Sequence, residues 1–104
     1  MSKRLAYLEK VTSSGSSDPF AWYGLALEYR SLERFDDALR VFEKLRAEHT
    51  DYVATYLMAA QMLEGMGRPG DAKTWAEAGL VAARKKGDSH AASELSTLIS
   101  SLEP

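Results

Sequence analysis

The apolar residues of this chain recur with a period of 34 residues, and no other feature limits its possible folds as strongly. Within each period they follow one another at intervals of three and four residues, which places them on one face of a helix. A period of this length, made of paired helices, predicts a helical solenoid in which each pair buries its apolar face against a neighbour. A shift of 34 residues superposes Trp22 on Tyr56, Leu25 on Ala59, Ala26 on Ala60, Tyr29 on Leu63, Leu32 on Met66, Ala38 on Ala72 and Phe42 on Ala76.

Helix-boundary signals divide the chain into five to six antiparallel helices and predict an all-α fold. Asp18 and Pro19 favour a helix start, because Asp caps N–H groups and Pro lacks the N–H that has no partner there. Gly87 favours a helix end, because glycine tolerates the left-handed conformation that often follows a helix. No window alternates with period two for the length of a strand. We expect one domain over 1–104, with an N-terminal helix at 3–13, repeats at 19–52 and 53–86, and a capping helix at 88–102.

Two segments of the first repeat match a known signature. Residues 22–29 read WYGLALEY and residues 38–42 read ALRVF. Together they resemble the tetratricopeptide repeat (TPR) family, whose signature is W-x-x-L-G/A-x-x-Y followed by A-x-x-x-F. The second copy keeps Tyr56, Ala60, Gly67 and Ala72, has Ala76 and Gly79 where larger residues are usual, and the late proline is replaced by Thr50 and Arg84. The resemblance covers 19–86 and implies a TPR-like solenoid of antiparallel helix pairs that acts as a non-catalytic protein-interaction module.

The resemblance also implies which residues bind a partner. In TPR domains the first helix of each pair usually lines a concave groove that holds an extended peptide or a helix. The corresponding residues are Phe20, Tyr23, Leu27 and Arg30 in the first repeat, Ala54, Leu57, Gln61 and Glu64 in the second, and Ala91, Leu95 and Leu98 in the last helix.

The chemistry of these positions predicts the kind of partner. Family members that clamp the C-terminal carboxylates of chaperones use Lys and Asn, where this chain has Tyr23, Leu27 and Gln61. An apolar peptide or an amphipathic helix therefore fits better than a chaperone carboxylate. The alternative is that Tyr23, Leu27 and Leu57 are simply buried by neighbouring helices.

The last helix departs from the repeat pattern. Its core-type positions hold His90, Glu94 and Thr97, so its apolar stripe is rotated by one position, about 100° on a helix. One interpretation is a capping helix turned to cover the second repeat. The other is an exposed stripe that makes a homodimer or docks a partner helix, with Leu95, Leu98, Ile99 and Leu102 in contact.

The remaining features give no support to other function classes. The chain is 45% apolar and lacks cysteine, which argues against disorder, disulfides and thiolate metal sites. Its net charge is −2, so global charge does not favour nucleic acid, and no apolar run is long enough for a membrane span.

Single motifs also have ordinary explanations. Gly65, Gly67 and Gly70 match G-x-G-x-x-G, but a helix rather than a strand precedes them, so a nucleotide site is not expected. The basic run 84–86 fits a helix C-terminus, and His49 and His90 lack the spacing of metal ligands. We expect no catalytic residue, metal or cofactor, and a cytoplasmic protein that binds a protein or peptide. An enzyme or a regulatory nucleotide binder remains the third alternative, with no residue constellation behind it.

Overall fold

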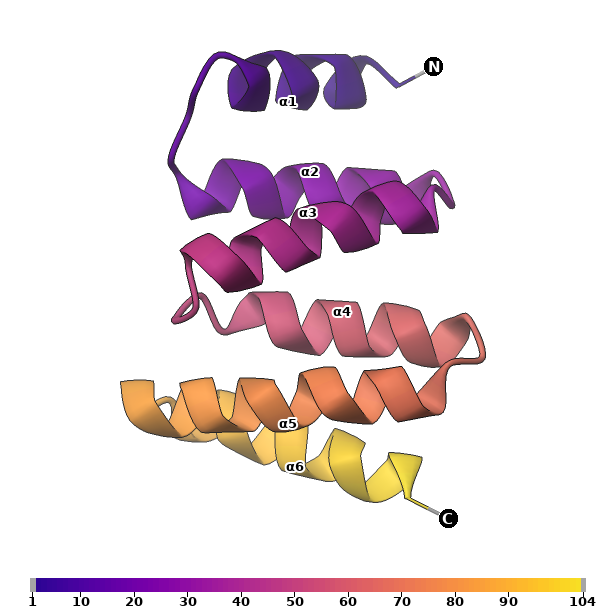
Figure 1. The fold of residues 1–104 in the computed structure, drawn as a ribbon, viewed down its shortest axis with the longest axis vertical. Coiled ribbons are helices and arrows are strands. Elements are labelled where there is room, and N and C mark those ends of the chain that lie inside the picture. The colour runs from indigo at the N-terminus through magenta and orange to yellow at the C-terminus, as the bar shows by residue number, and fades with distance from the viewer. Residues whose placement is uncertain (1, 104) are drawn as a thin grey trace. The chain divides into compact units, whose positions relative to one another are not determined.

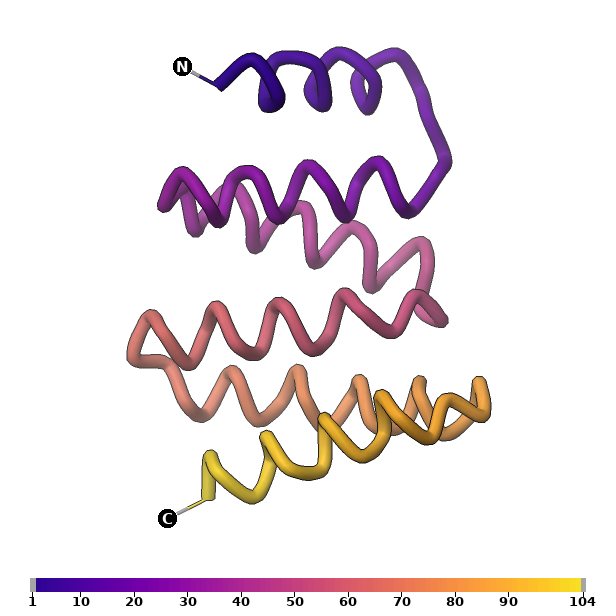
Figure 2. Tube along the Cα trace, turned by 180° about the vertical axis from the view of Figure 1, so that it is seen from behind, coloured from indigo at the N-terminus to yellow at the C-terminus, as the bar shows by residue number. Residues whose placement is uncertain are grey.

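The computed structural model describes residues 2–103, which contain six α-helices and no strand (Figure 1). The all-α fold predicted from the sequence is therefore confirmed. Consecutive helices within α1 to α3, and within α4 to α6, run antiparallel (Figure 2). The helices are α1 (Lys3–Ser13), α2 (Pro19–Ser31), α3 (Phe35–Glu48), α4 (Ala54–Gly65), α5 (Pro69–Lys86) and α6 (Ser89–Leu102).

The contacts of the chain form two compact units, divided between His49 and Thr50. In the first unit, α2 packs against both α1 and α3. In the second, α5 packs against both α4 and α6. The repeat limits at 52 and 86, and a single domain over 1–104, stay predictions.

Side chains and glycine define the helix ends as the sequence indicates. Ser2, Asp18 and Asp88 each accept a hydrogen bond from a backbone N–H in the first turn of the helix that follows. Pro19 begins α2, and Gly87 follows α5 in the left-handed conformation, with φ of 75°. These caps satisfy groups that a helix leaves without partners, which fixes where α1, α2, α5 and α6 begin or end.

Small residues bring the two helices of each pair together. Ala26 on α2 and Ala38 on α3 are fully buried, as are their counterparts Ala60 on α4 and Ala72 on α5. A methyl group at these positions lets two backbones approach closely, and larger side chains fill the space around the contact. Among the residues that do so, Phe42, Tyr56 and Leu63 are buried.

The two repeats form the same turn between their helices. The N–H of Arg34 donates to the carbonyl of Tyr29 at 2.8 Å, and 34 residues later the N–H of Arg68 donates to Leu63 at 2.9 Å. The residue before each arginine has a positive φ, 59° at Glu33 and 76° at Gly67. Leu32, which the pattern places on the apolar stripe, is 41% exposed because α2 ends there and the chain turns away.

Each repeat also anchors its first helix with one aromatic side chain. Trp22 donates from Nε1 to the carbonyl oxygen of Ser16 at 2.8 Å. Tyr56, its counterpart, donates from Oη to the carbonyl oxygen of Thr50 at 2.6 Å. Both acceptors lie six residues before their donor. An indole N–H in one repeat and a phenol O–H in the other therefore make the same tether between the helix and the segment before it.

Gly79 lets α5 pass close to its neighbours. A Cβ atom at Gly79 would lie 2.4 Å from Cβ of Tyr56 on α4 and 3.2 Å from Cδ2 of Leu95 on α6. Carbon atoms that are not bonded to each other do not approach to 2.4 Å, so any side chain at Gly79 would push α4 away from α5. The absence of a larger residue here, a departure from the TPR pattern, therefore has a direct steric cause.

We expect Gly79→Ala to lower the free energy of unfolding by about 1–3 kcal/mol, because the added methyl overpacks the contact with Tyr56. Gly24→Ala on α2 is the matched control, because its added Cβ would meet only the Leu8 side chain, at ordinary distances of 3.5 Å from Cδ2 and 4.0 Å from Cδ1. That control should gain up to about 1 kcal/mol of helix propensity. Urea unfolding followed by circular dichroism measures both. Equal shifts in the two variants would contradict the steric account.

We expect Tyr56→Phe to lower the free energy of unfolding by about 1 kcal/mol, because it removes only the hydroxyl that donates to Thr50. Tyr7→Phe serves as the control, since Tyr7 is exposed and makes no hydrogen bond in the described part of the chain. Urea midpoints compared among the three proteins provide the measurement. No difference between Tyr56→Phe and wild type would show that the tether contributes nothing.

Candidate functional site

An apolar cleft lies between α1 and α2 in the first unit. Its volume is about 360 Å³, within the range of ligand-binding pockets. We call it the α1–α2 cleft, and it is lined by Arg4, Tyr7, Leu8, Val11, Asp18, Phe20, Ala21, Tyr23, Gly24 and Leu27.

Two large aromatic side chains stand exposed at this cleft. Phe20 is 70% exposed and Tyr7 is 66% exposed. The other large apolar side chains with comparable exposure in residues 2–103 are Leu32 and Val81, and neither lines this cleft. Exposed aromatic side chains beside an apolar hollow are typical of protein-binding surfaces, where they act as anchors.

Polar contacts hold α1 against α2 and so maintain the α1–α2 cleft. Tyr29 on α2 donates from Oη to the carboxylate of Glu9 on α1 at 2.6 Å. Near the start of α1, Glu28 accepts from Ser2 Oγ at 3.4 Å and lies 3.5 Å from Arg4 Nε. On α2 these contacts come from two adjacent residues near its C-terminal end, and Leu5 on α1 is buried between the residues that they reach.

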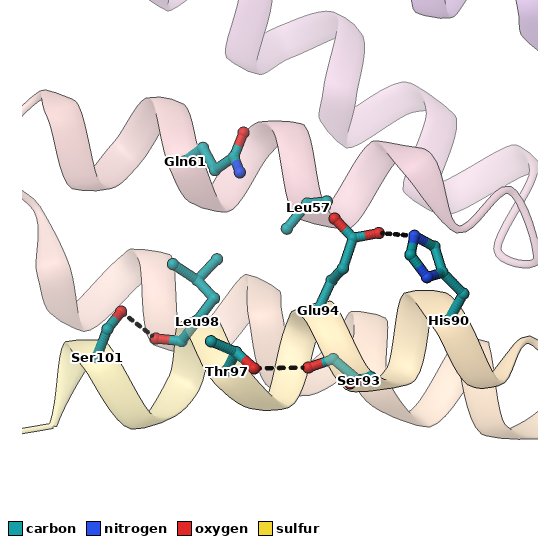
Figure 3. A pocket seen from close by; sticks show the side chains of 8 residues that line it. All are labelled: Leu57, Gln61, His90, Ser93, Glu94, Thr97, Leu98 and Ser101. Carbon is teal, nitrogen blue, oxygen red and sulfur yellow. Dashed lines mark hydrogen bonds and ion pairs between the residues drawn. The ribbon is translucent and has the colours of Figure 1, made fainter.

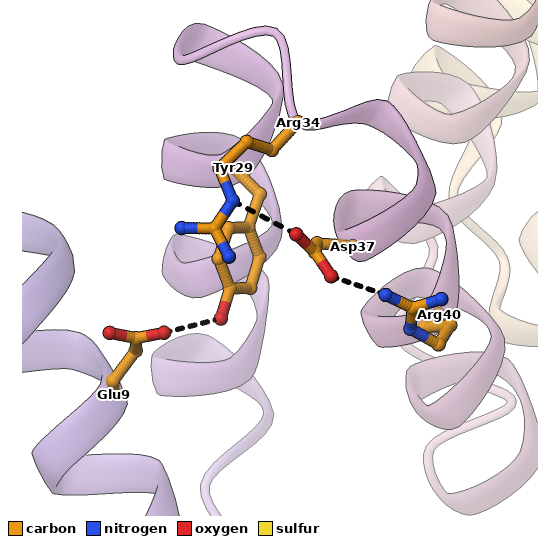
Figure 4. A network of polar contacts seen from close by, with 5 residues as sticks. All are labelled: Glu9, Tyr29, Arg34, Asp37 and Arg40. Carbon is orange, nitrogen blue, oxygen red and sulfur yellow. Dashed lines mark hydrogen bonds and ion pairs between the residues drawn. The ribbon is translucent and has the colours of Figure 1, made fainter.

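The Tyr29 contact continues into α3 (Figure 4). The Arg34 guanidinium lies over the Tyr29 ring at 4.6 Å and donates from Nε to Asp37 at 2.9 Å. Arg40 donates to the other carboxylate oxygen of Asp37. One chain of contacts therefore runs from α1 through α2 and the following turn to α3, and it stiffens the first unit.

These contacts shift two pKa values. Burial, followed by the hydrogen bond to Glu9 and its charge, raises the pKa of Tyr29 to about 12. The hydrogen bonds from Arg34 and then Arg40 hold the pKa of Asp37 below its usual range. Asp37 therefore stays ionised at neutral pH and Tyr29 stays neutral, which is the protonation state that the contacts require.

A second cleft, of different chemistry, lies between α4 and α6 in the second unit (Figure 3). Its volume is about 370 Å³. We call it the α4–α6 cleft. Leucine side chains from α4 and α6 form its apolar part, and polar side chains surround them. It is lined by Leu57, Gln61, His90, Ser93, Glu94, Thr97, Leu98 and Ser101.

Six of the residues implied as groove residues line these two clefts. Phe20, Tyr23 and Leu27 line the α1–α2 cleft, and Leu57, Gln61 and Leu98 line the α4–α6 cleft. Tyr23 and Leu57 are counterparts in the repeat, as are Leu27 and Gln61. Neither cleft is lined by Arg30, which is half-buried, or by Glu64, which is exposed.

The stripe considered for self-association is mostly turned inward. Leu95 is fully buried, and its side chain lies within contact distance of Gly79 on α5. Its assignment to an exposed stripe is therefore wrong. Leu98, Ile99 and Leu102 are half-buried, and Leu98 lines the α4–α6 cleft. The rotation of α6 read from the sequence explains this, because it turns the apolar stripe toward α5.

The sequence pattern missed the contribution of the flanking helices. Tyr7 and Arg4 on α1 line the first cleft, and the amphipathic pattern alone could not tell that α1 presents them beside Phe20. For α6, the sequence did contain a signal for the cleft residues. Polar residues at core-type positions, His90, Glu94 and Thr97, are the ones that line the second cleft.

Among residues 2–103, no three His, Asp or Glu side chains are grouped closely enough to hold a metal ion. Within the same range, none of the helices has the length and apolarity needed to span a membrane.

Comparison with known proteins places the chain in a family. A sequence profile of the tetratricopeptide repeat matches residues 19–62. The solution structure of a tetratricopeptide repeat domain protein from Salinibacter ruber is 33% identical, with a TM-score of 0.80, over 84% of this chain and 88% of that chain. The chain belongs to the tetratricopeptide repeat family.

Other solved structures agree with this TPR assignment. A crystal structure of a tetratricopeptide repeat domain protein from Salinibacter ruber is 33% identical, with a TM-score of 0.75, over 82% of this chain and 96% of that chain. A solution structure of a protein from Bordetella parapertussis is 25% identical, with a TM-score of 0.82, over 98% of this chain and 89% of that chain. No curated protein gives a significant match. TPR domains are generally non-catalytic modules that bind other proteins.

The raised pKa of Tyr29 predicts how stability depends on pH. The folded chain keeps this phenol neutral up to about pH 12, whereas an unfolded tyrosine ionises near pH 10. The stabilisation is therefore fully present below pH 10 and is lost as the pH rises through about 12. We expect the free energy of unfolding to fall across this window, and to fall less in Tyr29→Phe. Urea unfolding at a series of pH values measures the difference. Parallel curves for the two proteins would contradict the assignment.

Proposed function

We propose that this TPR protein is a non-catalytic interaction module that binds an apolar peptide or an amphipathic helix of a partner protein. The observation that carries the proposal is the exposure of Phe20 and Tyr7 at the α1–α2 cleft. When a partner covers exposed aromatic rings of this size, a large apolar area is removed from water, and this favours binding.

The shape and lining of the α1–α2 cleft support an apolar partner residue. Leu8, Val11 and Leu27 contribute aliphatic walls, and the aromatic side chains stand at the rim. An amphipathic helix that binds a groove presents apolar residues at three- and four-residue intervals. One such residue would enter the cleft while the next contacts Phe20.

The cleft is formed by helices that already hold each other in place. The hydrogen bond from Tyr29 to Glu9 and the contacts of Glu28 fix α1 on α2 without a partner. A surface that is formed in advance loses little conformational entropy on binding. The partner would therefore bear most of the ordering cost.

Self-association through α6 is the alternative. It has little apolar surface to use, since Leu95 is fully buried and Leu98, Ile99 and Leu102 are half-buried. The aromatic pair on the first unit offers more exposed apolar area, so we favour binding of a partner protein there.

The test is a selection from a phage-displayed library of random peptides, followed by fluorescence anisotropy with the enriched peptides. We expect enriched peptides to carry apolar residues at helical spacing. Phe20→Ser should weaken their binding about tenfold or more, as loss of a central aromatic anchor does. Because Phe20 is exposed, this variant should fold.

Val81→Ser is the matched control. Val81 on α5 is also an exposed apolar side chain, 56% exposed, but it lines neither cleft. Its substitution should leave the affinity unchanged. Enriched peptides without an apolar pattern, or equal affinities for the two variants, would overturn the proposal.

A further inference from the structure

The face that α1 contributes to the α1–α2 cleft corresponds to a face that the second helix of each repeat buries. Shifts of 34 and 68 residues superpose it on residues of α3 and α5 that are all buried. On α1 the same face is open, since Tyr7 is 66% exposed and Arg4 is exposed as well. The superposed residues are Arg4, Tyr7, Leu8 and Val11 on α1, Ala38, Val41, Phe42 and Leu45 on α3, and Ala72, Trp75, Ala76 and Gly79 on α5.

In the complete pairs, the first helix covers this face. Within the second unit, a Cβ atom at Gly79 would lie 2.4 Å from Cβ of Tyr56, and the ring of Trp75 lies 6.3 Å from the Tyr56 ring. Within the first unit, Lys44 Nζ on α3 lies 4.7 Å from the ring centre of Trp22, the counterpart of Tyr56. By this register α1 is the second helix of an incomplete pair, and none of the helices in residues 2–103 takes the place of its first helix.

We propose that an amphipathic helix of the partner protein binds in the α1–α2 cleft as the first helix of this incomplete pair. The inference rests on the proposed function and adds the direction of the bound helix. In the complete pairs the first helix runs antiparallel to the second (Figure 2). The bound helix therefore runs antiparallel to α1 and parallel to α2. Its anchoring residue takes the place of Tyr56 and contacts Tyr7 and Val11, the counterparts of Trp75 and Gly79.

The charges at the two ends of the α1–α2 cleft favour the same direction. Asp18 lies at the end where α2 begins, and its carboxylate caps that helix. Arg4 lies at the other end, beside Glu28 near the end of α2. A helix parallel to α2 begins near Asp18 and ends near Arg4. The positive end of its dipole then lies near a carboxylate and the negative end near a guanidinium group.

Arg4 also determines one residue of the partner helix. In the second unit, Tyr56 lies against positions 75 and 79, so Ala60, one turn later, is level with Ala72 on the antiparallel helix. Arg4 is the counterpart of Ala72, so it meets the partner residue four positions after the anchor. Only Nε of Arg4 approaches Glu28, at 3.5 Å, and its two Nη groups have no partner among residues 2–103. A carboxylate at that partner position would accept hydrogen bonds from them.

The probe is a helical peptide of about four turns, held by one hydrocarbon staple, titrated into the full ¹⁵N-labelled chain and followed by NMR. It carries tyrosine, leucine, glutamate and leucine in the spacing of Tyr56, Ala59, Ala60 and Leu63. A nitroxide at its C-terminus should broaden the amide signals of Arg4 and Glu28. A nitroxide at its N-terminus should instead broaden those of Val11 and Phe20.

The pairing with Arg4 is tested by substitution on both sides. Glutamine in place of the peptide's glutamate should weaken binding about two- to fivefold, the size expected for an exposed charge pair. Arg4→Gln should abolish this difference, and it should fold because Arg4 is exposed. Lys3→Gln is the matched control, since Lys3 is the neighbouring exposed cation and does not line the cleft. It should prefer the glutamate peptide as wild type does.

Broadening at Val11 and Phe20 by the C-terminal nitroxide would overturn the inference. So would absence of binding, binding to the second unit, or a preference for the glutamate peptide that survives Arg4→Gln. Shifts at the cleft that depend on the concentration of the free chain would contradict it too, because they would make a second copy the occupant. The proposed function is judged separately, by Phe20→Ser with selected peptides. A selected peptide that binds in an extended conformation and depends on Phe20 would support that function and contradict this inference.

Discussion

Close approach of paired helices is the constraint on which each unit depends. Ala26 and Ala38 in the first unit, and Ala60 and Ala72 in the second, have no exposed surface, and their small side chains allow the two backbones to lie close together. With the backbones at this separation, the aromatic tethers and inter-helix turns recur at the same positions in both repeats. The side chains on the remaining faces of α2 and α4 are then directed toward a third helix, and the clefts lie there.

The two clefts use equivalent repeat positions but differ in chemistry. Tyr23 and Leu27 on α2 correspond to Leu57 and Gln61 on α4. What differs more is the helix opposite, since α1 contributes apolar and aromatic side chains and α6 contributes hydroxyls and a carboxylate. In this chain the repeats supply the framework, and the flanking helices determine what each cleft can recognise.

Much of this architecture could be predicted from periodicity alone. The all-α fold follows from the 34-residue period and the capping signals, because both report local backbone preferences and burial. Phe20, Tyr23 and Leu57 were placed by alignment and do line clefts. The contribution of Tyr7 and the burial of Leu95 depend on the rotation and spacing of neighbouring helices, which a single helix pattern does not determine. The need for glycine at position 79 could not be predicted either, because it depends on which atoms of the neighbouring helices lie opposite.

The two inter-helix turns share their hydrogen bonds but not their residue at the left-handed position, and this makes them unequal. Glycine adopts a positive φ without steric cost, whereas Glu33 at φ of 59° costs about 1–2 kcal/mol. The two turns make the same hydrogen bonds, but only the turn between α2 and α3 contains a strained residue. The turn between α2 and α3 therefore needs the Arg34 contacts with Tyr29 and Asp37 to hold a strained residue in place, whereas the turn at Gly67 holds no such strain.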